Sequence, residues 1–354
     1  MSASVIVQLL DTLDALEFVT RHLQPPRLAA VVATLGDRDG ALRAAVADAV
    51  WPEHLEQVRD QILLAVEPTL RACDGLRSAG ESPDGLRQAY RAVRQVARAH
   101  EALYPLASTL PSVSGFFLEP SRRQDQALLN RLAEGAARTD VRTGVMHVAN
   151  DTSERGGFSV YVPEVYNPAH AHPLVVALHG GSGHGRLFLW SWLREARSRG
   201  VIVVTPTAIG ETWSLMEPTV DNGNLARVVD QVAQEWHVDR SRQLLTGMSD
   251  GGTFTLLSGL DEASPFTHLG PVAASFHPLL MTMADPRRVV GLPVYLVHGA
   301  LDWMFPVSMA RAAQHALTKA GVKVEYREIA DLSHVYPREA GGTMLDWLLT
   351  GPER

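Results

Sequence analysis

Residues 247–251 read Gly-Met-Ser-Asp-Gly, so a serine is flanked by a glycine two positions away on each side. A β-rich run precedes this pattern and a helical run follows it, which places Ser249 on a tight strand-to-helix turn. Glycines suit such a turn because larger side chains would crowd the neighbouring elements. The turn would lift the Ser249 hydroxyl out of the sheet, in front of the first helix amides. We interpret the pattern as a nucleophile elbow; a glycine-rich turn with an incidental serine is the alternative.

A serine hydroxyl is a poor nucleophile unless a base takes its proton and a carboxylate holds that base. Behind an elbow of this kind the partners follow in the order serine, acid, histidine. Asp302 comes after the apolar run 294–297, and His334 comes after the run 324–329. Both are expected at carboxyl ends of strands, where ligand sites on parallel sheets lie. The sequence therefore predicts a triad of Ser249, Asp302 and His334.

Other interpretations of these partners stay open at this point. Asp302 could be a turn or helix-capping aspartate, and His334 a histidine of a surface loop. His298 is the rival base, but its position at a strand end in a His-Gly pair favours a packed residue. Asp331 is the rival acid, but it stands too close in sequence to His334 to be its usual partner.

Residues 179–183 read His-Gly-Gly-Ser-Gly and directly follow the apolar run 174–178. Glycines let the backbone approach a substrate, so that its amides can point at a developing oxyanion. The predicted donors are the amides of Gly181 and of Asp250, the residue after the nucleophile. The stretch has neither the Gly-Lys-Ser/Thr of a phosphate loop nor the spacing of a dinucleotide loop. A plain flexible turn is the alternative.

Four further residues are candidates for lining an acyl or alcohol pocket, and core packing is the alternative for each. They are Met248, Trp213, His277 and Trp303. No metal site is expected, because no histidine pair has His-Glu-x-x-His spacing and Cys73, the single cysteine, is remote in sequence.

The elements that must position these residues change character near residue 140. Before it, apolar residues recur at three- and four-residue steps, as in 55–70 and 86–104, which indicates helices. After it, β-rich and helical runs alternate, which indicates a doubly wound, mostly parallel α/β sheet. We predict an all-helical N-terminal domain over 1–140 and an α/β catalytic domain over 141–354. The predicted strands are 141–148, 158–162, 174–178, 201–204, 243–246, 272–276, 294–297 and 324–329.

Composition narrows the class of protein. The chain of 354 residues carries a net charge of -7, which gives no support for nucleic acid or an anionic membrane as partner. No apolar run approaches the ~20 residues that span a bilayer. The amino terminus lacks the basic region of a signal peptide, and one cysteine allows no intrachain disulfide. We expect a cytoplasmic protein.

Residues from about 155 to 350 resemble the esterase branch of the α/β-hydrolases. The nearest groups are the phospholipase/carboxylesterase and the polyhydroxybutyrate-depolymerase-like (feruloyl-esterase-like) families. The matching stretches are 178–181, 213–221, 238–239, 246–252, 298–302 and 333–334. The resemblance implies an α/β-hydrolase fold and hydrolysis of small or short-chain carboxylic esters through an acyl-enzyme, with no cofactor. Two departures, Asp250 where Asn or Gln is common and Ser182 in place of a glycine, bear on substrate preference.

Three alternatives remain from the sequence. A thioesterase or a peptidase could use the same triad, because leaving-group choice depends on pocket shape. A non-enzymatic, hydrolase-like binding module is the other class, and the complete triad argues against it. The helical region could be a lid, a docking domain or an arm for homo-oligomerisation, because apolar residues at helical spacing prove only packing.

Overall fold

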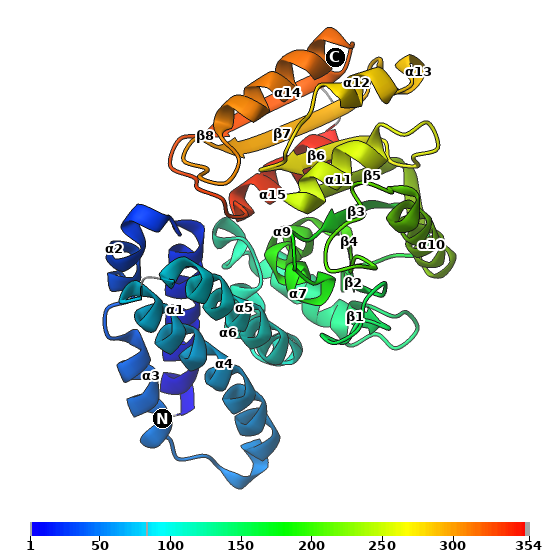
Figure 1. The fold of residues 1–354 in the computed structure, drawn as a ribbon. Coiled ribbons are helices and arrows are strands. Elements are labelled where there is room, and N and C mark those ends of the chain that lie inside the picture. The colour runs from blue at the N-terminus through cyan, green and yellow to red at the C-terminus, as the bar shows by residue number, and fades with distance from the viewer. Residues whose placement is uncertain (1, 83, 351–354) are drawn as a thin grey trace. The chain divides into compact units, whose positions relative to one another are not determined.

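The computed structural model describes residues 2–82 and 84–350. Backbone contacts divide it into two compact units, Met1–Ala133 and Glu134–Arg354. Figure 1 shows the first unit in blue to cyan and the second in green to red. The division falls within helix α7 (Gln126–Ala136), whereas composition alone suggested residue 140.

The first unit is built from helices, which confirms the predicted all-helical region. The apolar stripes become α4 (Glu56–Gly80) and α5 (Gly85–Leu103), and these two helices pack together. They approach closely at Gly75, where an added Cβ would lie 2.9 Å from the Ala92 side chain. The remaining helices of this unit are α1 (Ser2–Arg21), α2 (Leu28–Ala33), α3 (Arg38–Ala47) and α6 (Pro111–Phe116). The last three of them were not predicted from the sequence.

The second unit contains an eight-stranded sheet in the order β1-β2-β4-β3-β5-β6-β7-β8. Strands β1, β2 and β4 pair antiparallel, and all other pairs are parallel. This topology confirms the predicted doubly wound, mostly parallel sheet and is that of the α/β-hydrolase fold. The strands are β1 (Gly144–Val148), β2 (Phe158–Val162), β3 (His172–Leu178), β4 (Ile202–Pro206), β5 (Val238–Met248), β6 (His268–Val272), β7 (Pro293–Gly299) and β8 (Lys323–Ile329).

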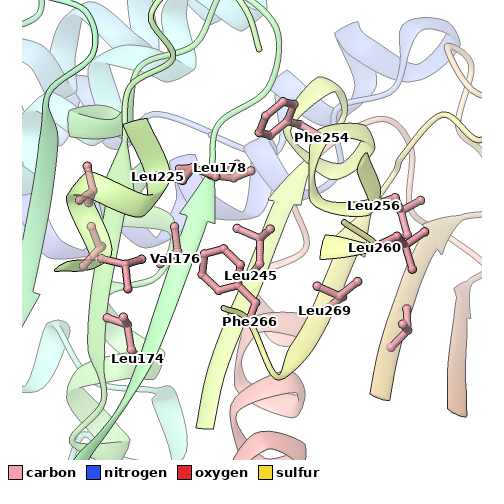
Figure 2. Close-up of a cluster of buried hydrophobic side chains, with 14 of the residues drawn as sticks. Leu174, Val176, Leu178, Leu225, Leu245, Phe254, Leu256, Leu260, Phe266 and Leu269 are labelled. Carbon is pink, nitrogen blue, oxygen red and sulfur yellow. The ribbon is translucent and has the colours of Figure 1, made fainter. Parts of the chain in front are cut away.

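Helices cover both faces of this sheet because successive side chains of a buried strand point to opposite faces. On one face, Val176 and Leu245 share a hydrophobic core with α10 (Thr219–Glu235), α11 (Asp250–Gly259) and α14 (Val307–Lys319). Figure 2 shows part of this core. On the other face, Thr246 meets Met344 of α15 (Arg338–Thr350), which packs against α9 (Leu193–Arg199). The short helices of this unit are α8 (Gly185–Phe188), α12 (Leu279–Met283) and α13 (Pro286–Val289).

One predicted strand was wrong. The apolar run 272–276 is not β6, which ends at Val272. Ala273 has a φ of 46°, a left-handed conformation that no extended strand contains. The true strand includes Gly270 and Pro271, which have low strand propensity and concealed it from a propensity argument.

Candidate active site

Ser249 stands on a sharp turn between β5 and α11. Its backbone has φ 56° and ψ -120°, a strained conformation for a residue with a side chain. The flanking glycines are sterically required. A Cβ at Gly247 would lie 2.5 Å from the Gly251 carbonyl, and one at Gly251 would lie 2.5 Å from the carbonyl oxygens of Leu178 and His179. The turn therefore has the geometry of a nucleophile elbow.

Hydrogen bonds connect Ser249 to a histidine and an aspartate from two other strand ends. The Ser249 hydroxyl lies 3.0 Å from His334 Nε2, and His334 Nδ1 lies 2.8 Å from Asp302 Oδ2. The three residues are 7%, 4% and 8% exposed, in the order Ser249, His334, Asp302. They follow β5, β8 and β7, so the parallel topology brings them to one edge of the sheet.

The Asp302 carboxylate fixes the tautomer of this histidine. Burial acts to raise the pKa of Asp302, but hydrogen bonds from His334 and from the Phe305 and Met304 amides outweigh it and hold that pKa below its ordinary value. An ionised carboxylate only accepts hydrogen bonds. His334 Nδ1 therefore carries a proton that it donates to Asp302, and Nε2 offers its lone pair to the Ser249 hydroxyl. This is the arrangement that general-base activation of a serine requires.

The rival base and acid have other surroundings than His334 and Asp302. His298 is fully buried, and its Nε2 lies 2.8 Å from the Phe305 carbonyl oxygen, to which it can only donate. That nitrogen is 3.5 Å from Asp302 Oδ2. Asp331 is exposed in the loop before His334, while Asp302 is the carboxylate that meets the imidazole.

The loop after β3 lies directly against the elbow. A Cβ at Gly180 would be 3.6 Å from the Ser249 Cβ, and a Cβ at Gly181 would be 2.6 Å from Asp250 Oδ2. The Gly183 amide closes a turn on the Gly180 carbonyl at 2.9 Å. Ser182 occupies this turn with a φ of 52°. Backbone can approach the nucleophile here because the two glycines have no side chains.

The two amides predicted as oxyanion donors belong to the loop after β3 and to the start of α11. Within residues 2–82 and 84–350, no acceptor is recorded for the amides of Gly181 and Asp250. Asp250 is the first residue of α11, where helical amides lack an intrahelical acceptor. Both are therefore available to an incoming carbonyl oxygen.

His179 stabilises the same loop from behind. Its Nε2 accepts a hydrogen bond from the Ala208 amide at 3.1 Å, so its proton is on Nδ1, which donates to the Gly180 carbonyl at 2.7 Å. The His179 carbonyl in turn accepts from the Trp213 indole at 2.8 Å. The loop 179–183 is thus held by contacts outside itself.

The four candidates for pocket residues differ in their surroundings. Trp213 is 2% exposed and stacks on Phe254 at a ring separation of 5.4 Å, so core packing, the alternative stated above, describes it. Met248 is half-buried beside the nucleophile, and His277 is exposed after β6. Trp303 is 44% exposed with its ring 6.4 Å from that of His334.

Sequence reasoning missed three residues that hold the site. Thr212 donates to Asp250 Oδ2 at 2.6 Å. Asp221, fully buried, accepts from the amides of Ile209 and Ser214 at 3.0 and 2.8 Å. Arg155 hydrogen-bonds main-chain carbonyls of two loops. Of these three, Asp221 could have been found from the sequence, because it ends the stretch 213–221 that resembles the esterase families. Arg155 and Thr212 lie in no recognisable motif.

The described part of the chain offers neither a metal site nor a membrane span. No group of three or more histidine, cysteine or acidic side chains in it could hold a metal ion. None of the helices in it is long and apolar enough to cross a membrane.

Part of the chain is similar in sequence to known esterases. Residues 216–348 match the family model described as Phospholipase/Carboxylesterase. The bifunctional acetylxylan esterase/xylanase XynS20E of Neocallimastix patriciarum is 30% identical over 148 residues, which are 40% of this chain and 21% of that protein. The chain thus spans about a fifth of the length of this curated relative.

Solved structures with similar coordinates include two hydrolases. A ferulic acid esterase is 16% identical with a TM-score of 0.48, and the similarity covers 58% of this chain and 98% of that one. The fluorophosphonate-binding serine hydrolase FphF of Staphylococcus aureus is 16% identical with a TM-score of 0.46, covering 58% of this chain and 97% of that one. The strand order gives the second unit the α/β-hydrolase fold, and residues 216–348 within it are similar to the phospholipase/carboxylesterase family.

Proposed function

We propose that this α/β-hydrolase cleaves carboxylic esters of small or short-chain acyl groups through an acyl-enzyme on Ser249. The observation that carries the proposal is the buried hydrogen-bonded series from Ser249 through His334 to Asp302. Its tautomer is the one needed to remove the serine proton. A binding module would have no use for a strained serine aligned with such a base.

The reaction is proposed in two steps. In the first, His334 Nε2 takes the Ser249 proton while Oγ bonds to the ester carbonyl carbon. The imidazolium then gives that proton to the leaving alcohol as the C–O bond breaks. In the second, water attacks the acyl-enzyme with His334 again as base, which releases the acid and restores Ser249. Asp302 orients the imidazole and stabilises its charged form.

Charge on the tetrahedral oxygen is proposed to be received by the amides of Gly181 and Asp250. This assignment rests on their free hydrogens and on the close approach of the 179–183 loop to the elbow. Such amides act without reorganisation because the loop and the helix start are already fixed. Trp303, exposed beside His334, is the proposed apolar contact for the acyl or alcohol group.

Hydrolysis of a series of p-nitrophenyl esters, from acetate upward, tests this function. We expect turnover by the wild-type protein, and its chain-length optimum measures the acyl pocket. Ser249→Ala is expected to remove the activity, whereas Ser308→Ala, an exposed serine in α14, should retain it. Equal activity of Ser249→Ala would rule the scheme out. Turnover of thioesters or peptides in place of all esters would favour the alternative classes that share the triad.

A further inference from the structure

Arg155 lies in the loop between β1 and β2 and binds two other loops at once. Its Nη1 donates to the Gly183 carbonyl at 2.8 Å. Its Nε donates to the carbonyls of Ala208 and Gly210 at 3.1 and 2.9 Å, and Nη2 donates to Gly210 and, at 3.1 Å, to Glu211. Every acceptor is a main-chain carbonyl.

A guanidinium held in this way loses hydration, which disfavours its charged form. Burial lowers the pKa of Arg155, although the charges of Asp221 and Glu211 act in the opposite direction. No ion pair to a carboxylate is recorded for it in the described residues. An arginine that binds carbonyls alone, without a paired charge, uses its N–H groups to fix backbone geometry.

The two loops that Arg155 joins both contact the turn that carries Ser249. Gly183 closes the turn that contains Gly181. The segment 208–211 leads into Thr212, which donates to the Asp250 side chain at 2.6 Å. Gly181 is thereby connected to the guanidinium through residues 182–183, and Asp250 through residues 211–212 and the hydrogen bond of the Thr212 hydroxyl.

The same β1–β2 loop supports the oxyanion loop at a second point. His184 Nε2 lies 2.9 Å from the Glu154 carbonyl, to which it donates, and its Nδ1 accepts from the Arg186 amide. Burial lowers the pKa of His184, which favours the neutral ring that this pattern needs. The loop around Arg155 thus has two separate attachments to residues 183–184.

We infer that Arg155 is a positioning residue for oxyanion stabilisation: by tying Gly183 to residues 208–211, it holds the Gly181 and Asp250 amides where the tetrahedral oxygen forms. The inference rests on the proposed function. Oxyanion donors contribute in the transition state more than in substrate binding, and small displacements of such groups reduce rate steeply. Loss of the guanidinium fork should therefore lower kcat and leave KM nearly unchanged.

Arg155→Lys is the sharpest variant, since it keeps the positive charge but replaces the planar fork, whose separate nitrogens reach the two loops, by a single ammonium nitrogen. Arg288→Lys is a matched control. Arg288 is also half-buried, donates to the carbonyls of Gly259 and Phe266 at 3.0 and 2.6 Å, and has its pKa lowered by burial. Its acceptors are the last residue of α11 and a residue of the loop before β6, so the two variants lose similar hydrogen bonds in different places.

We expect Arg155→Lys to lower kcat for a p-nitrophenyl ester by about 10- to 100-fold with KM within about threefold of wild type. Affinity for a trifluoromethyl ketone, which forms a tetrahedral adduct, should fall by the same factor, while Arg288→Lys leaves all three values within about twofold. Thermal unfolding establishes the folded fraction of each variant, and Arg155→Gln repeats the test if the lysine variant does not fold.

Three results would overturn the inference. These are an unchanged kcat in folded Arg155→Lys, a rise in KM at constant kcat, and equal losses of kcat in the Arg155 and Arg288 variants. Failure of the proposed function is distinguishable, because it would appear as wild-type protein without Ser249-dependent turnover.

Discussion

The side chains of Ser249, His334 and Asp302 form a series in which each group fixes the state of the next. The Met304 and Phe305 amides donate to Asp302 Oδ1 at 2.9 and 2.8 Å and leave Oδ2 for the imidazole. Because the pKa of Asp302 is lowered, this carboxylate stays ionised at any pH at which an esterase would be assayed. The tautomer of His334 is therefore set by Asp302 Oδ2, which can only accept a hydrogen bond from Nδ1.

Replacing Asp302 by Asn tests that role. The amide can donate to Nδ1 and so favour the wrong tautomer, with the proton on Nε2 facing Ser249. We expect kcat to fall by about 10³- to 10⁴-fold with little change in KM. Asp331→Asn, the same change in the exposed rival, should have little effect in the same steady-state assay. A larger loss in Asp331→Asn than in Asp302→Asn would reverse the assignment.

His268 provides a pH test of stability that is separate from catalysis. Burial lowers its pKa from 6.5 to about 4. Between pH 6.5 and 4 the unfolded chain binds a proton there that the folded chain does not, so stability falls as pH falls through this window and is unaffected above it. His268→Asn removes this proton uptake. Urea unfolding should give a slope of stability against pH that is smaller by up to ~1.4 kcal/mol per pH unit in the variant. Equal slopes would contradict the assignment to His268.

Individual residues were predicted well where local sequence carries the chemistry. The elbow motif around Ser249 and the apolar runs before Asp302 and His334 select three residues whose side chains lie within hydrogen-bonding distance. Their catalytic roles stay a prediction. Arg155 and Asp221 could not be predicted, because their roles come from loop carbonyls and amides that approach only after the sheet has formed. Trp213 shows that the sequence does not distinguish an aromatic residue that lines a pocket from one that packs in the core, because both occur in the same apolar patterns.

At the scale of elements, the elbow depends on backbone passing close to backbone. β5 and α11 meet at Gly247 and Gly251, and β3 passes beside both. The end of β5 and the start of α11 can come this close only because Gly247 and Gly251 have no Cβ. The turn is therefore as much a packing feature as a catalytic one.

Two glycine substitutions separate these effects. Gly247→Ala would put a Cβ 2.5 Å from the Gly251 carbonyl, and we expect a loss of about 1–3 kcal/mol in unfolding free energy. Gly223→Ala, inside α10 with no atom within 4 Å of its added Cβ, should gain about 0.5–1 kcal/mol. Chemical denaturation compares the pair directly. A stable Gly247→Ala protein would mean that the turn has room for a side chain.

The pattern of elements was largely predictable, since continuous apolar runs mark buried parallel strands. β6 was the exception, because Gly270 and Pro271 weaken its signal while the run after it is apolar but bends at Ala273. Short helices such as α2 and α3 were not predicted, because a helix of only a few turns contains too few apolar residues for their spacing to be recognised.

At the scale of the molecule, each compact unit has its own buried core. Leu9 of α1 is fully buried in the helical unit, and Leu245 of β5 is fully buried in the α/β unit. Domains with separate cores can unfold separately. The sequence indicated this division by its change of composition, but helix α7 runs across it and conceals the boundary.

Leu9→Ala and Leu245→Ala form a pair of probes for this independence. Each should cost about 2–5 kcal/mol in its own unit. Calorimetry of the full chain should show two transitions, with each variant lowering the temperature of a different one. Equal shifts of both transitions by either variant would mean that the units unfold as one.

The central claim is that Ser249 carries the acyl group, and covalent trapping tests it most directly. Rapid acid quench during turnover of a p-nitrophenyl ester, followed by trypsin, should give a peptide of residues 243–287 that is heavier by the mass of the acyl group. Fragmentation must assign the added mass among its serines, which are Ser249, Ser258, Ser264 and Ser275. The account predicts the acyl group on Ser249 alone and none in Ser249→Ala. An acyl group on any other residue, or turnover without an adduct in Ser249→Ala, would contradict it.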